Sequence, residues 1–161
     1  MGSFRRFWLN TVASNSIWTT RQRSVLYRLG GIECRAVAMY PGLAVYGDAK
    51  VTLGRECVIN AGCTFDATGP ITMAPGSGLA YNCSVLTSTH ELGPSEKRYG
   101  PVVVGRVDIG RGVWVGANVT IFPNVTIGAG SVIGAGSLVT KDVPPNSLVM
   151  GVPGKVVRTL D

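Results

Sequence analysis

Residues 103–139 read VVGRVDIGRGVWVGANVTIFPNVTIGAGSVIGAGSLV, and an isoleucine or valine occupies every sixth position of this stretch. The series starts at Val103 and reaches Val139 without a gap. A helix repeats at about 3.6 residues and a half-buried strand at about 2, so neither element explains this period. A six-residue period predicts a hexapeptide parallel β-helix, in which each unit forms one flat face of a triangular coil.

Three such units make a coil of about 18 residues, and each residue then stacks on the residue 18 positions later, about 4.8 Å away. We therefore expect Ile109 to lie beneath Ile127, and Val115 beneath Ile133. The position four residues after each aliphatic is also expected to point inward, and glycines such as Gly116 are expected at the corners. These inward positions are Val113, Val119, Val125, Ser131, Ser137 and Val143.

The same period runs through the preceding part of the chain, with two interruptions. Leu53, Ile59 and Phe65 share one phase, and the segment around Pro70–Met73 shifts that phase by two residues. A second break follows His90, because residues 91–102 carry charges, glycines and Pro94 where an aliphatic is required. We interpret 91–102 as a loop ejected from the coil, and such loops often carry function.

Composition supports a single domain of this kind. The chain has 161 residues, 22 of them glycine, and only 15% are charged. No apolar run is long enough to cross a bilayer and the N-terminus lacks the features of a signal peptide, so a cytoplasmic location is expected. The four cysteines form no CxxC pair and are expected to be buried, reduced thiols.

Positive charge is concentrated at the start of the chain. Residues 1–35 contain six arginines and one glutamate, a net charge of +5, whereas the remainder carries +1. Apolar residues at helical spacing predict a helical segment here. Two interpretations remain open: a cap over the open end of the coil with solvated arginines, or a surface that contacts an anionic membrane or a phosphate-bearing acceptor. No nucleic-acid partner is expected, because no recognition motif is present.

His90 is the only histidine, in the sequence Thr87–Ser88–Thr89–His90. An imidazole is a natural general base for a hydroxyl, because its protonation changes near neutral pH. The alternative is an incidental surface histidine. One histidine cannot supply a three-histidine zinc site, so no metal is expected. No Gly-x-Ser-x-Gly nucleophile elbow occurs either.

Three further motifs carry a family resemblance: WVG at 114–116, IGAGSVIGAGSLVTKDVPPN at 127–146 and GVPGKVVR at 151–158. Together with Ile59–Asn60 and Thr89–His90, they resemble the hexapeptide-repeat acyltransferases, most closely the maltose and galactoside O-acetyltransferase branch. The resemblance covers roughly residues 44–158. It implies a left-handed β-helix over 36–161, with the loop at 91–102 and a C-terminal tail after 143, following a basic helical segment at 1–35.

The resemblance also implies acetyl-CoA as co-substrate, an acceptor hydroxyl on a sugar or sugar-bearing molecule, and a homotrimer with sites between subunits. His90 matches the catalytic base and Asn60 an acceptor contact. Asp66 is a candidate acceptor contact, because Thr68 stands where some relatives carry an acidic residue. The positions that match donor contacts are Trp114, Ala117, Ala135, Thr140, Lys141, Lys155 and Arg158.

These matches leave the acceptor open. Glu91 follows His90 where the sugar branch usually has proline, and Ala117 lacks the hydroxyl that some relatives carry. One alternative is N-acetylation of an amino sugar by the same machinery. A second is a non-catalytic structural solenoid, for which we would expect a flat and regular polar face.

Overall fold

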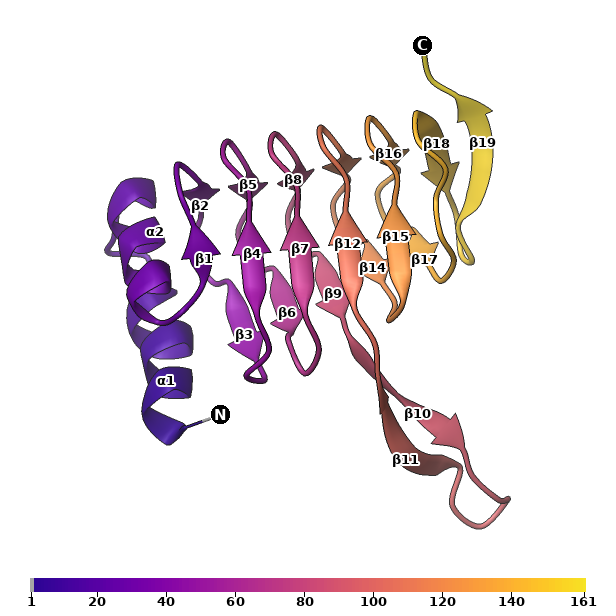
Figure 1. The fold of residues 1–161 in the computed structure, drawn as a ribbon, viewed down its shortest axis with the longest axis horizontal. Helices are drawn as coiled ribbons and strands as arrows, with labels where there is room; N and C mark the ends of the chain where they lie inside the picture. Colours follow the sequence, from indigo (N-terminus) through magenta and orange to yellow (C-terminus); the bar gives the residue numbers. More distant parts are fainter. Residues whose placement is uncertain (1) are drawn as a thin grey trace.

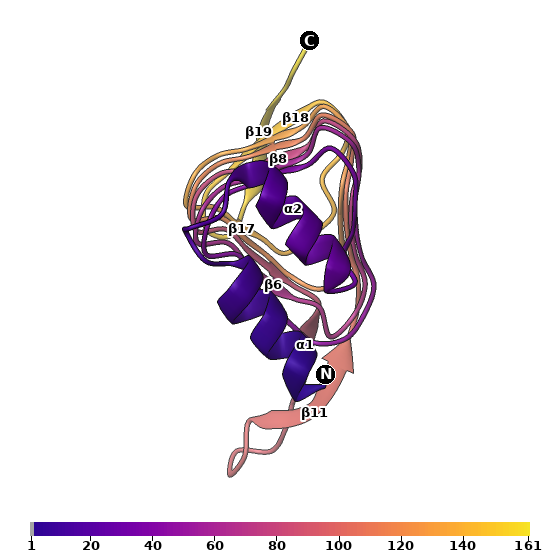
Figure 2. The ribbon, with the colours of Figure 1, turned by 90° about the vertical axis from the view of Figure 1, so that its left-hand side faces the viewer.

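A computed structural model describes residues 2–161 of the protein. The chain winds into a coil of about six turns with a triangular cross-section, as Figure 1 and Figure 2 show from two sides. In Figure 1 the nearest strands run upward and the chain returns behind them, while each turn advances from left to right. The coil is therefore left-handed, as the resemblance implied.

Three sheets form the faces of the coil, and all of their strands except β19 run parallel. Sheet I consists of β1 (Glu33–Cys34), β4 (Val51–Leu53), β7 (Ile71–Met73), β12 (Val107–Ile109) and β15 (Val125–Ile127). Sheet II consists of β2 (Ala38–Met39), β5 (Val58–Ile59), β8 (Gly78–Leu79), β13 (Trp114–Val115), β16 (Val132–Ile133), β18 (Ser147–Met150) and β19 (Lys155–Thr159). Sheet III consists of β3 (Ala44–Tyr46), β6 (Thr64–Asp66), β9 (Ser84–Leu86), β14 (Thr120–Ile121) and β17 (Leu138–Val139).

The register follows the repeat. Ile109 pairs with Ile127 and Val115 with Ile133, as predicted. Phe65 pairs with Val85, twenty positions later, because two extra residues occupy the corner between β6 and β7. The predicted phase shift is thus confirmed as a longer turn. All six predicted inward positions between 113 and 143 are buried, and so are the four cysteines, which are free thiols.

Close approach between turns explains several glycines. A Cβ added to Gly110 would lie 2.6 Å from the backbone nitrogen of Ala129 in the next turn. One added to Gly116 would lie 2.6 Å from that of Ala135. Gly110 and Gly116 therefore lie directly after strands, where adjacent turns are in close contact. Other residues adopt the left-handed conformation at the corners, for example Asn118, whose φ is 57°.

An antiparallel hairpin replaces the predicted loop at 91–102. It consists of β10 (Ser88–Leu92) and β11 (Tyr99–Val104), which project away from the coil in Figure 1. The hairpin leaves sheet III after β9 and returns to sheet I at β12. Val103, the first member of the six-residue series, pairs with Thr89 inside the hairpin. Its place in that series was therefore coincidental.

Helices cover the N-terminal end of the coil, which confirms the helical segment (Figure 2). They are α1 (Ser3–Phe7), a π-helical turn (Trp8–Ala13) and α2 (Thr20–Leu29), which begins with a capping box between Thr19 and Gln22. Arg23 is 1% exposed and donates to the carbonyl of Met39 at 2.8 Å. The Asn10 side chain both donates to and accepts from the backbone of Val45.

At the other end, the predicted tail after 143 folds back onto the coil. β18 pairs in parallel with β16 and so extends sheet II by one strand. β19 then pairs antiparallel with β18 and forms the last strand of that sheet. The tail therefore carries its cationic residues along the edge of sheet II.

Candidate active site

His90 lies on β10, opposite Val102, with its side chain exposed. Its Nδ1 is 2.7 Å from the carbonyl oxygen of Gly100 on β11. A carbonyl oxygen only accepts, so Nδ1 carries the hydrogen and the neutral ring keeps its lone pair on Nε2. The Tyr99 ring stands edge-on to the imidazole at a centroid distance of 6.0 Å. The hairpin thus holds His90 in the tautomer that a general base needs at Nε2.

Asp66, at the end of β6, ties the base of this hairpin to the coil. One carboxylate oxygen accepts from the backbone N–H and hydroxyl of Ser88, at 3.0 and 2.5 Å. The other accepts from the backbone N–H and hydroxyl of Thr68, at 3.1 and 2.6 Å. A carboxylate has about four lone-pair positions, and these four donors occupy them.

The same network fixes the protonation state of Asp66. Burial alone favours the neutral acid, but the hydrogen bonds from Ser88 and Thr68 outweigh it and lower the pKa of this carboxyl. Thr87 adds to the junction, because its hydroxyl donates to the backbone carbonyl of Asp66 at 2.6 Å. The hairpin that carries His90 therefore starts from an ionised, fully hydrogen-bonded anchor.

A second group of predicted residues lies along the corner between sheets II and III. Asn60, Ala117 and Ala135 occupy turns that follow β5, β13 and β16, and backbone hydrogen bonds of 2.8–3.0 Å connect successive turns. The Asn60 amide donates to the carbonyl of Leu79 at 3.1 Å. We call this row the corner ridge, and it consists of Asn60, Ala61, Tyr81, Ala117 and Ala135.

Trp114 lies on the outer surface of sheet II beside the corner ridge and is 45% exposed. A Cβ on Gly78 would lie 3.0 Å from two of its ring atoms, so the indole lies across that glycine. In register, Trp114 pairs with Val132, Val132 with Leu148, and Leu148 with Arg158. Trp114 and Arg158 therefore occupy one column of the sheet, about 14 Å apart at three strand spacings.

Lys155 shares β19 with Arg158, and both side chains are exposed. Thr140 and Lys141 lie elsewhere, at the corner between sheets III and I after β17. The hairpin leaves the coil from this same corner. The predicted donor residues thus fall into two groups, one along sheet II and its corner ridge and one near the base of the hairpin.

Within one chain, His90 does not meet the predicted residues of sheet II and the corner ridge. The hairpin with His90 projects from the corner between sheets III and I (Figure 2). Asn60 directly follows β5 and Trp114 lies on β13, so both belong to sheet II or to its corner with sheet III. No three His, Cys, Asp or Glu side chains among residues 2–161 are grouped so that they could hold a metal ion. A site that used all of these predicted residues would therefore need surfaces from two corners of the coil.

Sequence reasoning missed three residues that shape these surfaces. Gly100 and Ser88 orient the hairpin and its histidine, and Gly78 makes room for Trp114. Ser88 could have been suspected from its place two residues before His90. Gly78 could not, because its pairing with Trp114 spans 36 residues and depends on how much chain the hairpin removes from the coil.

Comparison with known proteins gives the family. The model of the bacterial transferase hexapeptide, described as six repeats, matches residues 106–141. A Staphylococcus haemolyticus protein that is provisionally named an acetyltransferase is 40% identical over 142 residues, which are 88% of this chain and 74% of that protein. This chain belongs to the hexapeptide-repeat transferase family. It spans little more than half (56%) of a similarly named Staphylococcus aureus protein, at 45% identity over 70% of this chain.

Solved structures similar to this hexapeptide transferase include enzymes named for sugar substrates. A maltose O-acetyltransferase from Clostridium difficile is 28% identical with a TM-score of 0.77, over 95% of this chain and 83% of that one. A galactoside acetyltransferase in complex with coenzyme A is 25% identical with a TM-score of 0.73, over 99% and 79%. A Bacillus cereus N-acyltransferase, solved with dTDP-4-amino-4,6-dideoxyglucose and coenzyme A, is 25% identical with a TM-score of 0.66, over 78% and 70%.

Proposed function

We propose that this protein transfers an acetyl group from acetyl-CoA to a hydroxyl of a sugar or sugar-bearing acceptor. The observation that carries the proposal is His90, whose Nδ1 is held by the Gly100 carbonyl so that Nε2 is free to accept a proton. The likeness to maltose and galactoside acetyltransferases supports the donor and the acceptor class.

The reaction needs one base and no covalent enzyme intermediate. Nε2 of His90 takes the hydroxyl proton as the acceptor oxygen attacks the thioester carbonyl, and a tetrahedral oxyanion forms. A backbone N–H in the Ala117 turn is our candidate donor to that oxyanion. When the intermediate collapses, the C–S bond breaks, and the imidazolium returns the proton to the leaving thiolate. The products are the acetyl ester and free coenzyme A.

The donor would lie along sheet II. Trp114 and the turns at Ala117 and Ala135 form a mostly uncharged surface that suits a pantetheine arm. Lys155 and Arg158 supply cations at the far edge of the same sheet, where the phosphates of the nucleotide would bind. Thr140 and Lys141 are assigned to the donor as well, and Asn60 to the acceptor.

We assign Asp66 to holding the hairpin, because its lone pairs are already occupied. We further propose that the active site forms between copies in a homotrimer. One copy would contribute the hairpin with His90, and its neighbour would contribute the corner ridge and Trp114. This arrangement brings together the two surfaces that a single chain keeps apart.

The test is release of coenzyme A thiol from acetyl-CoA in the presence of a panel of sugars and oligosaccharides. We expect acceptor-dependent release and a loss of about 10²–10⁴-fold in kcat for His90→Asn. Ser95→Ala, at the turn of the same hairpin, is the matched control and should retain activity. Full activity in His90→Asn would overturn the assignment of the base.

N-acetylation of an amino sugar is the second candidate, favoured by the likeness to the Bacillus cereus N-acyltransferase. The same base would then deprotonate the attacking nitrogen. The two products differ chemically, since mild alkali cleaves an acetyl ester and leaves an acetamide intact. Mass spectrometry of the product before and after alkali therefore separates the two reactions.

A further inference from the structure

The outer surface of the helical cap exposes an unusual set of side chains. Four large apolar side chains are between 43% and 74% exposed, namely Phe4, Phe7, Val25 and Leu29. Three exposed arginines accompany them, namely Arg6, Arg21 and Arg28. We call these seven residues the cap surface.

Helical spacing places these residues away from the coil. Arg21, Val25 and Leu29 follow one another at intervals of four on α2, so they share one face of that helix. The opposite face of α2 buries Arg23 and Tyr27 against the coil. The apolar side chains of the cap surface are therefore additional to those that hold the helices in place.

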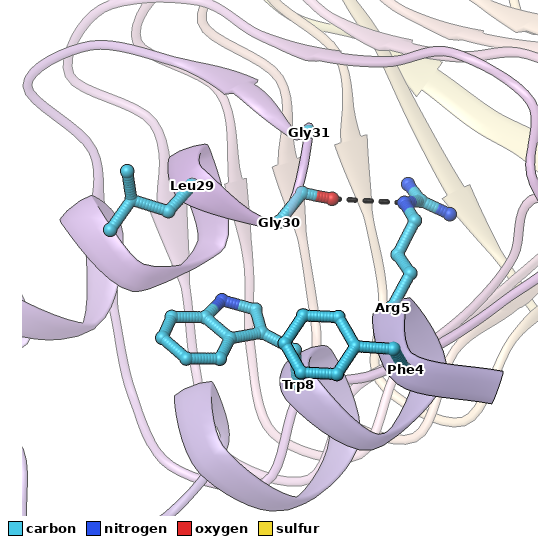
Figure 3. A pocket seen from close by; sticks show the side chains of 6 residues that line it. All are labelled: Phe4, Arg5, Trp8, Leu29, Gly30 and Gly31. Atoms are coloured by element: carbon cyan, nitrogen blue, oxygen red, sulfur yellow. Dashed lines mark hydrogen bonds between the residues drawn. The ribbon is translucent and has the colours of Figure 1, made fainter. Parts of the chain in front are cut away.

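Two hollows lie side by side within this end of the molecule. The first is about 500 Å³ and lies between Phe4, Trp8 and Leu29, which Figure 3 shows together with Arg5 and two glycines. The second is about 670 Å³ and shares Gly31 with the first. Its charged lining residues are three arginines and one glutamate, namely Arg28, Arg35, Arg55 and Glu33. An apolar groove thus adjoins a hollow rich in guanidinium groups.

Positive charge predominates around the cap surface. The sequence has no aspartate or glutamate between residues 2 and 32. The two acidic side chains next to this end, Glu33 and Asp48, are paired with Lys50 at 3.1 Å and with Arg5 at 3.3 Å. Two such surfaces brought face to face would place arginine against arginine, which opposes self-association through this end. A partner with an anionic surface and an apolar interior would match both the arginines and the exposed apolar side chains of the cap surface.

We propose that the cap surface docks on a membrane that contains anionic phospholipid. Phe4, Phe7 and Leu29 enter the boundary between headgroups and acyl chains, and the arginines contact lipid phosphates. No helix among residues 2–161 is long and apolar enough to cross a membrane, so the contact we propose is peripheral. This inference does not depend on the reaction proposed above.

The test is co-sedimentation of the full chain with phospholipid vesicles. We expect binding to vesicles of phosphatidylcholine with phosphatidylglycerol, much weaker binding to pure phosphatidylcholine, and release as salt concentration rises. Phe4→Ser with Leu29→Ser should reduce the bound fraction at least several-fold. Arg21→Gln with Arg28→Gln should reduce binding to the anionic vesicles only. Circular dichroism would show whether each variant keeps its fold.

Arg106→Gln with Arg111→Gln is the charge-matched control, since both arginines lie on the coil far along the chain from the cap. It should bind vesicles like the unchanged protein. The proposal is wrong if the unchanged protein does not bind anionic vesicles, or if the control loses binding as the cap variants do. Concentration-dependent self-association that disappears in Phe4→Ser with Leu29→Ser, without vesicle binding, would instead identify a second copy as the partner.

Discussion

Asp66 connects the regular coil to its one long insertion through a single carboxylate. Its carboxylate oxygens accept two hydrogen bonds from Thr68, in the same corner, and two from Ser88, at the start of the hairpin. Hydrogen bonds to a charged group contribute about 1.5–3 kcal/mol each. The side chain therefore fixes Ser88, and we expect this to help position His90, two residues further along β10.

We expect Asp66→Asn to lower stability by about 1–3 kcal/mol, because an amide oxygen cannot accept all four hydrogen bonds and the amide hydrogens meet donors. The kcat should fall while the KM for acetyl-CoA stays unchanged, since only the position of His90 is disturbed. Urea unfolding and steady-state kinetics measure the two effects. Asp108→Asn removes an exposed pair with Arg106 and should change neither.

The stabilising effect of Asp66 should also depend on pH. Its folded pKa lies below the ordinary value of 3.8, so the contribution is fully present above that value. It should be lost as pH falls through the lowered folded pKa. The difference in unfolding free energy between the unchanged protein and Asp66→Asn should therefore be largest near neutrality and shrink in acid.

At the scale of elements, the sequence predicted the coil better than the hairpin. Every-sixth-residue aliphatics specify both the inward face and the stacking partner, so Ile109 and Ile127 could be paired from the sequence. The hairpin has no such repeat, and its charges, glycines and Pro94 are typical of a loop. Antiparallel pairing across 88–104 was therefore mistaken for a loop that began three residues later.

Tight stacking between turns gives a second prediction. Gly110→Ala should lower the free energy of unfolding by about 1–3 kcal/mol, because the new methyl group meets the backbone of the next turn at Ala129. Gly2→Ala is the control, since a Cβ there has no neighbour within 4 Å. Equal urea midpoints for the two variants would contradict the close contact.

β19 carries a third prediction. Lys155→Gln with Arg158→Gln should raise the KM for acetyl-CoA about tenfold or more and change kcat little, because two cations that we assign to phosphates are removed. The KM for the acceptor should stay constant. Arg106→Gln with Arg111→Gln removes the same charge elsewhere on the coil, so an equal rise in that variant would indicate a general charge effect.

At the scale of the whole molecule, a single chain leaves the candidate site divided between two corners. The candidate residues could be predicted from the sequence, but their separation in space could not. That separation depends on the number of turns between His90 and the residues of sheet II and on the direction of the hairpin, and both are set by long-range strand pairing. The family resemblance implied a homotrimer, in which two copies would bring these residues together. The separation of the two corners in one chain is the observation that supports our proposal of a trimer.

Trimers that mix two inactive variants test whether the active site forms between copies. His90→Asn copies and Lys155→Gln, Arg158→Gln copies should each be nearly inactive alone at low acetyl-CoA. Unfolding and refolding them together should recover a substantial fraction of activity, because some interfaces would join an intact hairpin to an intact β19. Refolding each variant separately and then mixing is the control. No recovery in co-refolded samples, with trimers confirmed by ultracentrifugation, would place both groups in one chain.

The capping helices have a consequence for how the protein behaves in concentrated solution. A parallel coil ends in strands whose backbone groups would accept another copy, as in fibril growth. Asn10 occupies the backbone groups of Val45, Arg23 occupies the carbonyl of Met39, and the Tyr27 hydroxyl occupies that of Leu43. These side chains form hydrogen bonds that another strand would otherwise form, and they present no new strand edge to a second copy. We therefore expect the cap to prevent further strands from adding to this end of the coil, and substitution of these three polar residues to favour aggregation.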